Sequence, residues 1–332
     1  MNDISHYFFL LSIYKRDETI DDIIKLAKEL ILFKPTRFFP NRRGIKRLNK
    51  ESFFDFWTEE LNASKRLYFQ IGGKVPQPYY GNLELSLLYF PTTDIIQIHF
   101  SITETERDIL KETEKIVRSF AEKHTIIVSA LRNLNEWKYN DDTNIKHISE
   151  LHPEINEMKT VGTKPVERPD PEQFPAHTHN IDGIWFGCCY EMWFGSDYDK
   201  YIPLEKLRSF NQCKLNETLE NGTVHIVLYD SPDDFASEKS VANAWALRKH
   251  TECDKEADFW EAQVRELSKG LGQQVYEIEE GKFPHGGIRL IKTYLDENGK
   301  HVPKHEAVKV HISEREHDGK AVFEKTVELN KI

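Results

Sequence analysis

The sequence predicts an α+β protein: antiparallel or mixed sheets with amphipathic helices packed on one face, followed by a C-terminal β-meander. Segments in which apolar and polar residues alternate predict half-buried strands, and segments with apolar residues three and four apart predict helices. The chain has 332 residues, 39% hydrophobic and 30% charged, which suits one large or two ordinary folded domains rather than a disordered chain.

The first elements are a strand and a helix. The apolar run from His6 to Lys15 predicts a buried strand. Asp17 can cap a helix that continues to about Phe33, and Pro35 would end it. The apolar stripe of this helix consists of Ile20, Ile23, Ile24, Ala27, Leu30 and Ile31.

Three strands are expected next, at residues 66–73, 82–90 and 94–102, because alternating segments with glycine and proline turns indicate antiparallel pairing. We then expect a helix that opens at Thr103, with Glu106 completing a capping box. A further buried strand is expected at residues 125–131.

Residues 140–175 are polar and contain five prolines, which predicts a linker. This linker would separate an N-terminal α+β domain at residues 1–139 from a second α+β domain at residues 176–271. The C-terminal meander at residues 272–332 would follow as a third part.

The second α+β domain should contain a short helix after Pro203 and a strand at residues 222–230. Ser231 fits the N-cap of a following helix, and another helix is expected from about Asp254 to Gly270.

The last 60 residues contain four strand-like segments. Asn298-Gly299 and Asp318-Gly319 are typical of tight hairpin turns. Together they predict an antiparallel meander.

The net charge of −10 makes nucleic acid and anionic membranes poor default partners and suits a basic partner protein. No apolar run approaches the roughly 20 residues that span a bilayer, and the N-terminus lacks the basic start of a secretory signal. Four cysteines without a disulfide-type spacing indicate reduced thiols. We therefore expect a cytoplasmic protein without a membrane partner, and no phosphate-loop or dinucleotide motif points to a cofactor.

The one basic cluster lies at residues 37–47, where five arginine or lysine residues accompany Phe38 and Phe39. Such a mixture of cations and aromatic rings could bind phosphate or nucleic acid. In a chain this acidic, the simpler interpretation is a solvated loop whose phenylalanines enter the core.

A weak metal candidate consists of His177, His179 and Asp182, with Cys188 and Cys189 nearby. Two histidines two residues apart on a strand share a face, and a carboxylate or thiolate could complete a zinc site. Adjacent cysteines point to opposite faces of a strand, however, so surface histidines beside buried cysteines are the simpler interpretation. One thiol beside a histidine could also be a nucleophile, although an apolar setting would make it inert.

The densest aromatic stretch lies between His179 and Pro203 and contains two Trp-Phe-Gly triplets. It is either core or a partner-binding surface, because tryptophan, tyrosine and phenylalanine anchor interfaces. The even spacing of Trp185 and Trp193 would place both on one face of an uninterrupted strand. As a surface with acids suited to a basic target, it would use Trp185, Phe186, Tyr190, Trp193, Phe194, Asp197, Tyr198 and Asp199.

The order of these features resembles that of immunity proteins from bacterial polymorphic-toxin systems, in particular the group called immunity protein 52. The resemblance rests on residues 71–91, 182–203 and 221–235 and covers about residues 6–250. It implies a non-enzymatic, cytoplasmic α+β protein of bacteria that binds and blocks a toxin. The long proline-rich segment and the C-terminal meander depart from the family pattern.

The leading hypothesis is therefore a non-catalytic protein-binding factor, an immunity or antitoxin-type protein that neutralises a toxin by direct binding. The alternative is a metal-dependent nuclease or hydrolase of a phage-defence or mobile-element system that uses His177, His179 and Asp182. A third hypothesis is a prophage or defence-system component that works through homo-oligomerisation, in which an edge strand of the meander pairs with another copy.

Overall fold

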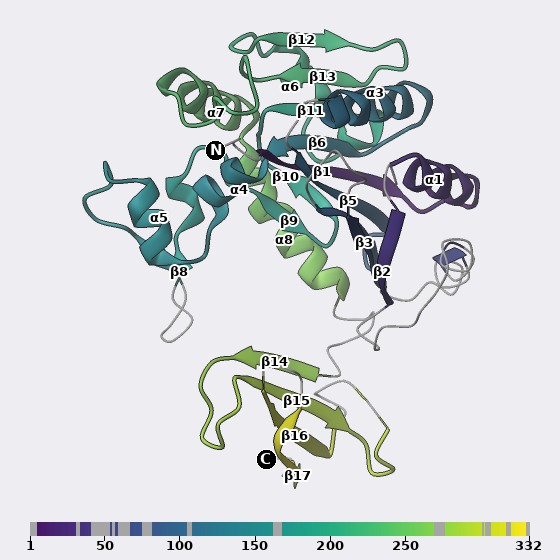
Figure 1. Ribbon diagram of the computed structural model, residues 1–332, viewed down its shortest axis with the longest axis vertical. Helices are drawn as coiled ribbons and strands as arrows, with labels where there is room; N and C mark the ends of the chain where they lie inside the picture. The colour runs from purple at the N-terminus through teal and green to yellow at the C-terminus, as the bar shows by residue number, and fades with distance from the viewer. Residues whose placement is uncertain are drawn as a thin grey trace. The chain divides into compact units, whose positions relative to one another are not determined.

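Within the residues that the structure describes, a nine-stranded antiparallel sheet organises the chain, in the order β12-β13-β11-β6-β1-β5-β4-β3-β2 (Figure 1). The predicted α+β class is confirmed. The computed structural model describes residues 5–30, 34–40, 54, 57–58, 67–74, 82–104, 108–161, 168–268, 276–300, 302, 307–316 and 320–329.

The central strand β1 (Ser5–Tyr14) confirms the first predicted strand. It pairs with β5 (Ile95–Glu104) on one side and with β6 (Val128–Asn133) on the other. Its apolar run is continuous because both faces of the sheet are covered at this position, so that successive residues are buried on opposite sides. The buried residues are Tyr7, Phe9, Leu10, Leu11, Ser12 and Ile13.

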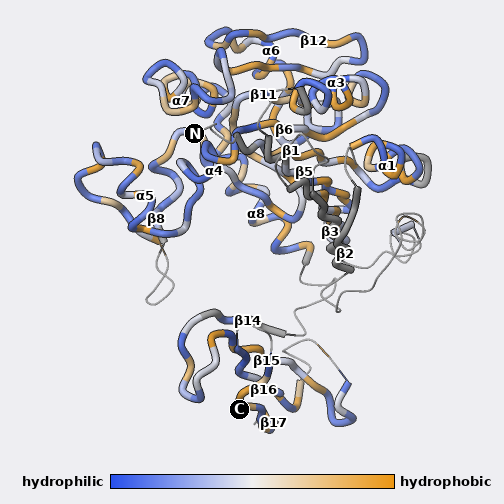
Figure 2. The backbone as a smooth tube through the Cα atoms, viewed as in Figure 1, coloured by the Kyte–Doolittle hydropathy of each residue, from blue (hydrophilic) through white to orange (hydrophobic). Residues whose placement is uncertain are grey.

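Helix α1 (Asp17–Leu30) follows as predicted, with hydrophobic and hydrophilic residues alternating along it (Figure 2). Residues 31–33, which were expected to continue it, lie outside the described residues. Pro35 lies in the edge strand β2 (Lys34–Pro40), where a missing N–H group is tolerated. Of the predicted stripe, the buried residues are Ile20, Ile23, Ile24, Ala27 and Leu30.

Strands β3 (Leu67–Lys74), β4 (Asn82–Phe90) and β5 form the predicted antiparallel series. The expected helix start at Thr103 is wrong, because β5 continues to Glu104 and helix α3 spans Asp108–Lys123. Thr103 instead pairs with His6 of β1, so pairing with the central strand outweighs the local capping signal.

The proline-rich segment is structured rather than an open linker. It contains the end of α4 (Leu134–Asp141), then α5 (Ile145–Leu151), β7 (Thr160–Val161), β8 (Arg168–Pro169) and the 3-10 turn η1 (Pro171–Gln173). Ile148, His152 and Phe174 within it are buried. Its prolines shorten the elements and do not separate two domains.

The second half contributes to the same sheet. A hairpin of β9 (His179–Ile181) and β10 (Ile184–Phe186) precedes β11 (Glu191–Phe194), which pairs with β6 and with β13 (Val224–Val227). The remaining pieces are η2 (Ser196–Tyr198), the predicted short helix α6 (Leu204–Ser209), and the edge strand β12 (Leu215–Thr218).

The last two helices of this half are α7 (Glu238–Thr251) and the predicted α8 (Cys253–Ser268). The N-cap of α7 is Ser237, so the expected cap at Ser231 is wrong. The Ser231 hydroxyl instead accepts a hydrogen bond from the Asp233 amide within a turn, which the same residue types also favour.

Helices cover both faces of the large sheet, whereas the sequence was expected to place them on one. The core beneath α1 and α3 contains Phe9, Leu11 and Trp193. The opposite core contains Leu10, Met192 and Phe194 together with residues of α6, α7 and α8. Alternate residues of the central strands therefore enter different cores.

The expected division into domains at residues 1–139, 176–271 and 272–332 needs correction. The first compact unit extends to Val264, because the strands on either side of the proline-rich segment share one sheet. The second unit begins at Arg265, within α8.

The second unit contains the predicted four-stranded meander, in the order β14-β15-β16-β17. Asn298 and Gly299 form a turn after β15, and Gly299 has a φ of +79°. The other expected turn, at Asp318-Gly319, lies outside the described residues. The strands are β14 (Tyr276–Glu280), β15 (Arg289–Leu295), β16 (Lys309–Arg315) and β17 (Ala321–Glu328).

Candidate functional site

The aromatic stretch is core rather than surface. Strand β11 lies inside the sheet between β6 and β13, and helices cover both faces there, so all four of its residues are buried. The expected partner-binding surface is therefore wrong for five side chains, each 3% exposed or less: Trp185, Phe186, Trp193, Phe194 and Tyr198.

Trp185 and Trp193 also do not share a face. They lie on separate strands, β10 and β11, with residues 187–190 between them, and they enter opposite cores. The condition for a shared face, an uninterrupted strand, is not met.

The three other expected surface residues are at least partly accessible. Tyr190 is half-buried, and Asp197 forms an ion pair of 2.8 Å with Arg16. Asp199 accepts a hydrogen bond over 2.8 Å from the amide of Leu204, the first residue of α6. Both aspartates therefore have structural roles.

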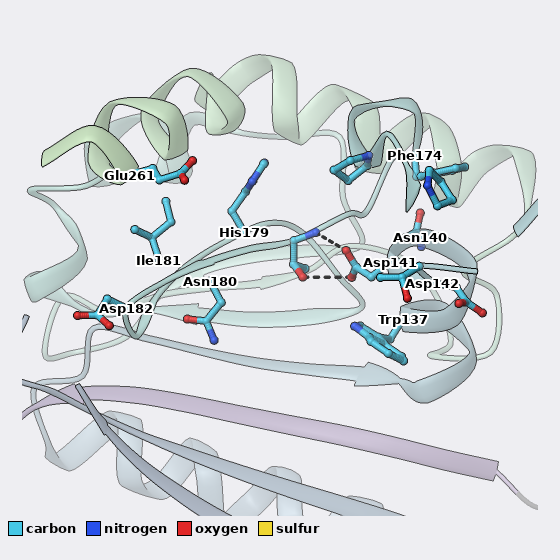
Figure 3. A pocket seen from close by; sticks show the side chains of 14 residues that line it. Trp137, Asn140, Asp141, Asp142, Phe174, His179, Asn180, Ile181, Asp182 and Glu261 are labelled. Atoms are coloured by element: carbon cyan, nitrogen blue, oxygen red, sulfur yellow. Dashed lines mark hydrogen bonds between the residues drawn. The ribbon is translucent and has the colours of Figure 1, made fainter. Parts of the chain in front are cut away.

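A pocket of about 550 Å³ lies where α4, β9 and α8 approach one another (Figure 3). Among the described residues, no lysine or arginine lines it, whereas four carboxylates do. Its lining residues are Trp137, Asn140, Asp141, Asp142, Thr143, Pro169, Pro171, Phe174, Thr178, His179, Asn180, Ile181, Asp182 and Glu261.

Hydrogen bonds attach the end of α4 to the segment that leads into β9. Asp141 accepts from the amide of Thr178 at 2.8 Å and from its hydroxyl at 3.1 Å (Figure 3). Asp141 also forms a buried ion pair of 3.0 Å with Arg132. Asn140 accepts from the Ala176 amide at 3.0 Å, so this end of the pocket is preorganised.

The opposite end of the pocket is the β9–β10 turn. Asp182 and Gly183 both have positive φ angles, +51° and +93°, which gives the two-residue hairpin turn. The Thr93 hydroxyl donates to the Asp182 carbonyl over 2.6 Å and holds the turn against the loop between β4 and β5. Glu261 of α8 lies near this end in Figure 3.

Trp137 is the exposed aromatic residue of the pocket. It belongs to α4, and 38% of its surface is accessible. A tryptophan this accessible at a concave site is a common anchor for a bound side chain.

The predicted histidine pair does come together, but with a different acid. His177 Nε2 lies 2.9 Å and His179 Nε2 lies 3.1 Å from Oδ1 of Asp254, on α8. Asp182 is part of the hairpin turn and is not in this cluster. Cys188 and Cys189 are likewise not members.

Arg248 of α7 completes the cluster and is 2% exposed. Its Nη2 contacts the Asp254 carboxylate and lies 2.6 Å from His177 Nε2, and its Nη1 donates to the His177 carbonyl over 2.6 Å. Burial alone would raise the pKa of Asp254, but hydrogen bonding by His177 and His179 and the charge of Arg248 hold it well below its usual range.

Three potential ligand atoms for a metal lie within 4.8 Å of one another in this cluster, on His177, His179 and Asp254. The guanidinium of Arg248 contacts two of them, so a fixed cation already occupies the place where a metal ion would bind. A second cation there would be repelled at short range in a partly buried site. The chemistry of this donor set therefore fits an internal ion pair better than a zinc site.

The cysteines do not provide a reactive thiol. Burial raises the pKa of Cys188 to about 12 and that of Cys253 to about 11, and it also raises that of Cys189 well above its usual value. The thiolate, which is the nucleophilic form, is therefore strongly disfavoured. The expected inertness in an apolar setting agrees with this geometry.

A second polar cluster lies beneath α3. His225 is hydrogen-bonded through Nδ1 to Glu217 at 2.8 Å and through Nε2 to Glu191 at 2.7 Å. Burial and the charge of Glu191 raise the pKa of Glu114, on α3, to about 7. Glu217 also forms an ion pair of 2.9 Å with Arg118 of α3, so this cluster joins α3 to the sheet.

Sequence reasoning missed Arg248, Asp254 and Trp137. Asp254 and Arg248 are separated from His177 by 77 and 71 residues, and no short motif connects them. Trp137 sits in a short helix of low amphipathicity, just before the segment at residues 140–175 that was interpreted as a linker. Of the basic cluster at residues 37–47, residues 37–40 belong to the edge strand β2 instead of a loop, and residues 41–47 lie outside the described residues.

No helix in the described part of the chain is long and apolar enough to cross a membrane. In comparisons with known proteins, no family model and no curated protein matches this chain. The choice of a candidate site therefore depends on the geometry of the structure, and by that criterion the acidic pocket is the best defined.

Proposed function

We propose that this protein is a non-catalytic protein-binding factor of the immunity or antitoxin type, which neutralises a toxin by direct binding in the cytoplasm. The proposal combines the resemblance in the order of sequence features with the geometry of the pocket. It replaces the aromatic stretch with the pocket as the binding site, because most of that stretch is buried.

The observation that carries the proposal is the contrast between the pocket and the buried cluster beside it. The pocket is open and bordered by an accessible tryptophan and four acids. His177 and Cys188 are instead buried and engaged by Arg248 or by carbonyl groups, and His179, which lines the pocket, is hydrogen-bonded to Asp254. Such a surface suits recognition better than turnover.

Charge supports a basic target. The chain has a net charge of −10, and no lysine or arginine lines the pocket among the described residues. Opposite charge on a partner would accelerate association and contribute specificity. A basic, nucleic-acid-cleaving toxin would have this charge.

The second candidate function is a metal-dependent nuclease or hydrolase. The convergence of His177, His179 and Asp254 is the specific observation that favours it. Arg248 argues against it. Metal analysis of the purified protein separates the two, because an enzyme of this kind would retain about one equivalent of zinc that His179→Ala removes.

The direct test is copurification of the tagged chain from its native host, followed by mass spectrometry of stoichiometric partners. The partner gene is then expressed alone and together with this chain. We expect growth arrest from the partner alone and restored growth with this chain present. A copurified protein that does not arrest growth, or an arrest that this chain does not relieve, would contradict the proposal.

A further inference from the structure

The acidic groups of the pocket are distributed along β9 rather than gathered at one point. Asp141 accepts a hydrogen bond from Thr178, which lies just before β9, and Asp182 comes directly after the last residue of β9. At roughly 3.3 Å per residue, four residues of extended chain separate these positions by about 13 Å. Figure 3 shows Asp141 and Asp142 near one end and Asp182 and Glu261 near the other.

This separation limits what can occupy the pocket. A single metal ion or ammonium group cannot contact both ends, since ligand distances to an ion are about 2–3 Å. A volume of about 550 Å³ is large enough for several residues of peptide or for a drug-sized molecule. An occupant that uses the whole pocket therefore needs two cationic groups on an extended frame.

The end near α4 has features beyond its acids. Trp137 lines the pocket there and is 38% exposed. The C-terminus of α4 lies at the same end, where the helix dipole places partial negative charge. A guanidinium can stack on an indole while it donates to carboxylate and carbonyl oxygens.

We propose that the pocket binds an extended segment of a basic partner protein through two arginine or lysine side chains about four residues apart. One side chain stacks on Trp137 beside Asp142, and the other lies between Asp182 and Glu261. This inference deepens the proposed function, on which it rests, by stating how the partner is recognised.

The test uses the full chain with selectively ¹⁵N-labelled tryptophan, which gives one indole signal for each of the six tryptophans. The Trp137 signal is assigned with the Trp137→Phe variant. The probe is the peptide acetyl-Arg-Thr-Ser-Thr-Arg-amide, in which β-branched residues favour an extended form. The control peptide has glutamate in place of both arginines.

We expect the Trp137 signal to shift and saturate with the arginine peptide, while the buried Trp185 and Trp193 signals stay in place. A peptide with one arginine should bind at least about fivefold more weakly, as expected for loss of one contact worth about 1 kcal/mol. The Asp142→Asn/Glu261→Gln variant should lose the shift. The matched variant Glu220→Gln, which removes an exposed acid elsewhere, should keep it.

An unmoved Trp137 signal at millimolar arginine peptide would overturn the inference, and so would an equal shift with the glutamate peptide. The comparison between peptides needs no variant, so a misfolded variant would not remove the test. The outcomes also separate this inference from the proposed function. If the Asp142→Asn/Glu261→Gln chain still neutralises the toxin, the role of the pocket is refuted but the immunity function is not. If the peptide binds but no toxin is found, the immunity function is refuted but the peptide-binding role of the pocket is not.

Discussion

The guanidinium of Arg248, on α7, donates from Nη1 to the main-chain oxygen of His177 over 2.6 Å. The same side chain contacts the Asp254 carboxylate at the start of α8. One buried cation thus connects two helices to the strand segment that leads into the pocket. Its charge is matched by an acid only six residues further along the chain, at the start of the next helix.

Replacement of Arg248 by methionine should lower the free energy of unfolding by about 3 kcal/mol, because it leaves a partly buried carboxylate without its cation. The value is at the lower end of the usual range because 36% of the Asp254 side chain is exposed. Urea denaturation measures it. The double variant Arg248→Met/Asp254→Asn should lose less stability than the sum of the two single variants, and simple additivity would contradict the coupling.

Trp193 and Trp137 should respond very differently to truncation. Trp193 is 1% exposed, so Trp193→Ala should destabilise the protein by about 3–5 kcal/mol. Trp137 is accessible, so Trp137→Ala should change stability by less than about 1 kcal/mol while it weakens partner binding. Denaturant midpoints of the two variants check this. Similar losses would mean that the assignment of core and surface is wrong.

Local patterns predicted most of the elements but not all of their ends. The spacing of Ile20, Ile23 and Ala27 predicted helix α1, and the alternation of apolar and polar residues predicted strands β4 and β5. The starts at Thr103 and Ser231 were wrong because each signal also fits a strand end or a turn. At Thr103, pairing with a neighbouring strand decided between these options, and pairing is not encoded locally.

Most of the candidate site could not be predicted from the sequence. His177 and His179 were recognised as a pair, but the acid that they share is contributed by α8 across a long sequence separation. The aromatic stretch was compatible with both core and surface, because both favour large apolar side chains. The position of β11 between two strands settled the choice, and it depends on the topology of the whole sheet.

Gly183 should not tolerate a side chain. A Cβ at this position would lie 2.7 Å from Phe90 and 2.8 Å from Ile95, and its φ is +93°. Gly222 has a similar φ of +87° but nothing within 4 Å, so Gly222→Ala serves as the matched control. The control should cost about 1–2 kcal/mol through backbone strain alone. Gly183→Ala should cost about 1–3 kcal/mol more through overpacking, and equal denaturant midpoints would contradict the close approach.

The thiols should be distinguishable by reactivity. Cys188, Cys189 and Cys253 are buried with raised pKa values, whereas Cys213 is only half-buried. A chromogenic disulfide reagent at pH 8 should therefore modify one thiol or none in the folded protein and all four in denaturant. The Cys213→Ser variant should abolish the reaction of the folded protein. Rapid modification of a second thiol would reopen the nucleophile hypothesis.

Glu136 should make the protein less stable as the pH rises. Its side chain is fully buried and hydrogen-bonded to Tyr229, and burial raises its pKa to about 8. A glutamate in the unfolded chain has a pKa of about 4.3. Between these values the unfolded state has released the proton that the folded state keeps, so stability is greatest below about pH 4 for this group and falls towards pH 8.

The slope attributable to Glu136 can reach about 1.4 kcal/mol per pH unit. The Glu136→Gln variant has no titrating group at this position, so its free energy of unfolding should fall less than that of the natural sequence between pH 5 and pH 8. Urea denaturation at several pH values gives both curves. The exposed Glu150, replaced by glutamine, is the control and should leave the profile unchanged. If the curves of the natural sequence and Glu136→Gln run parallel, the carboxyl is ionised in the folded protein, and Arg132 must then be neutralising it.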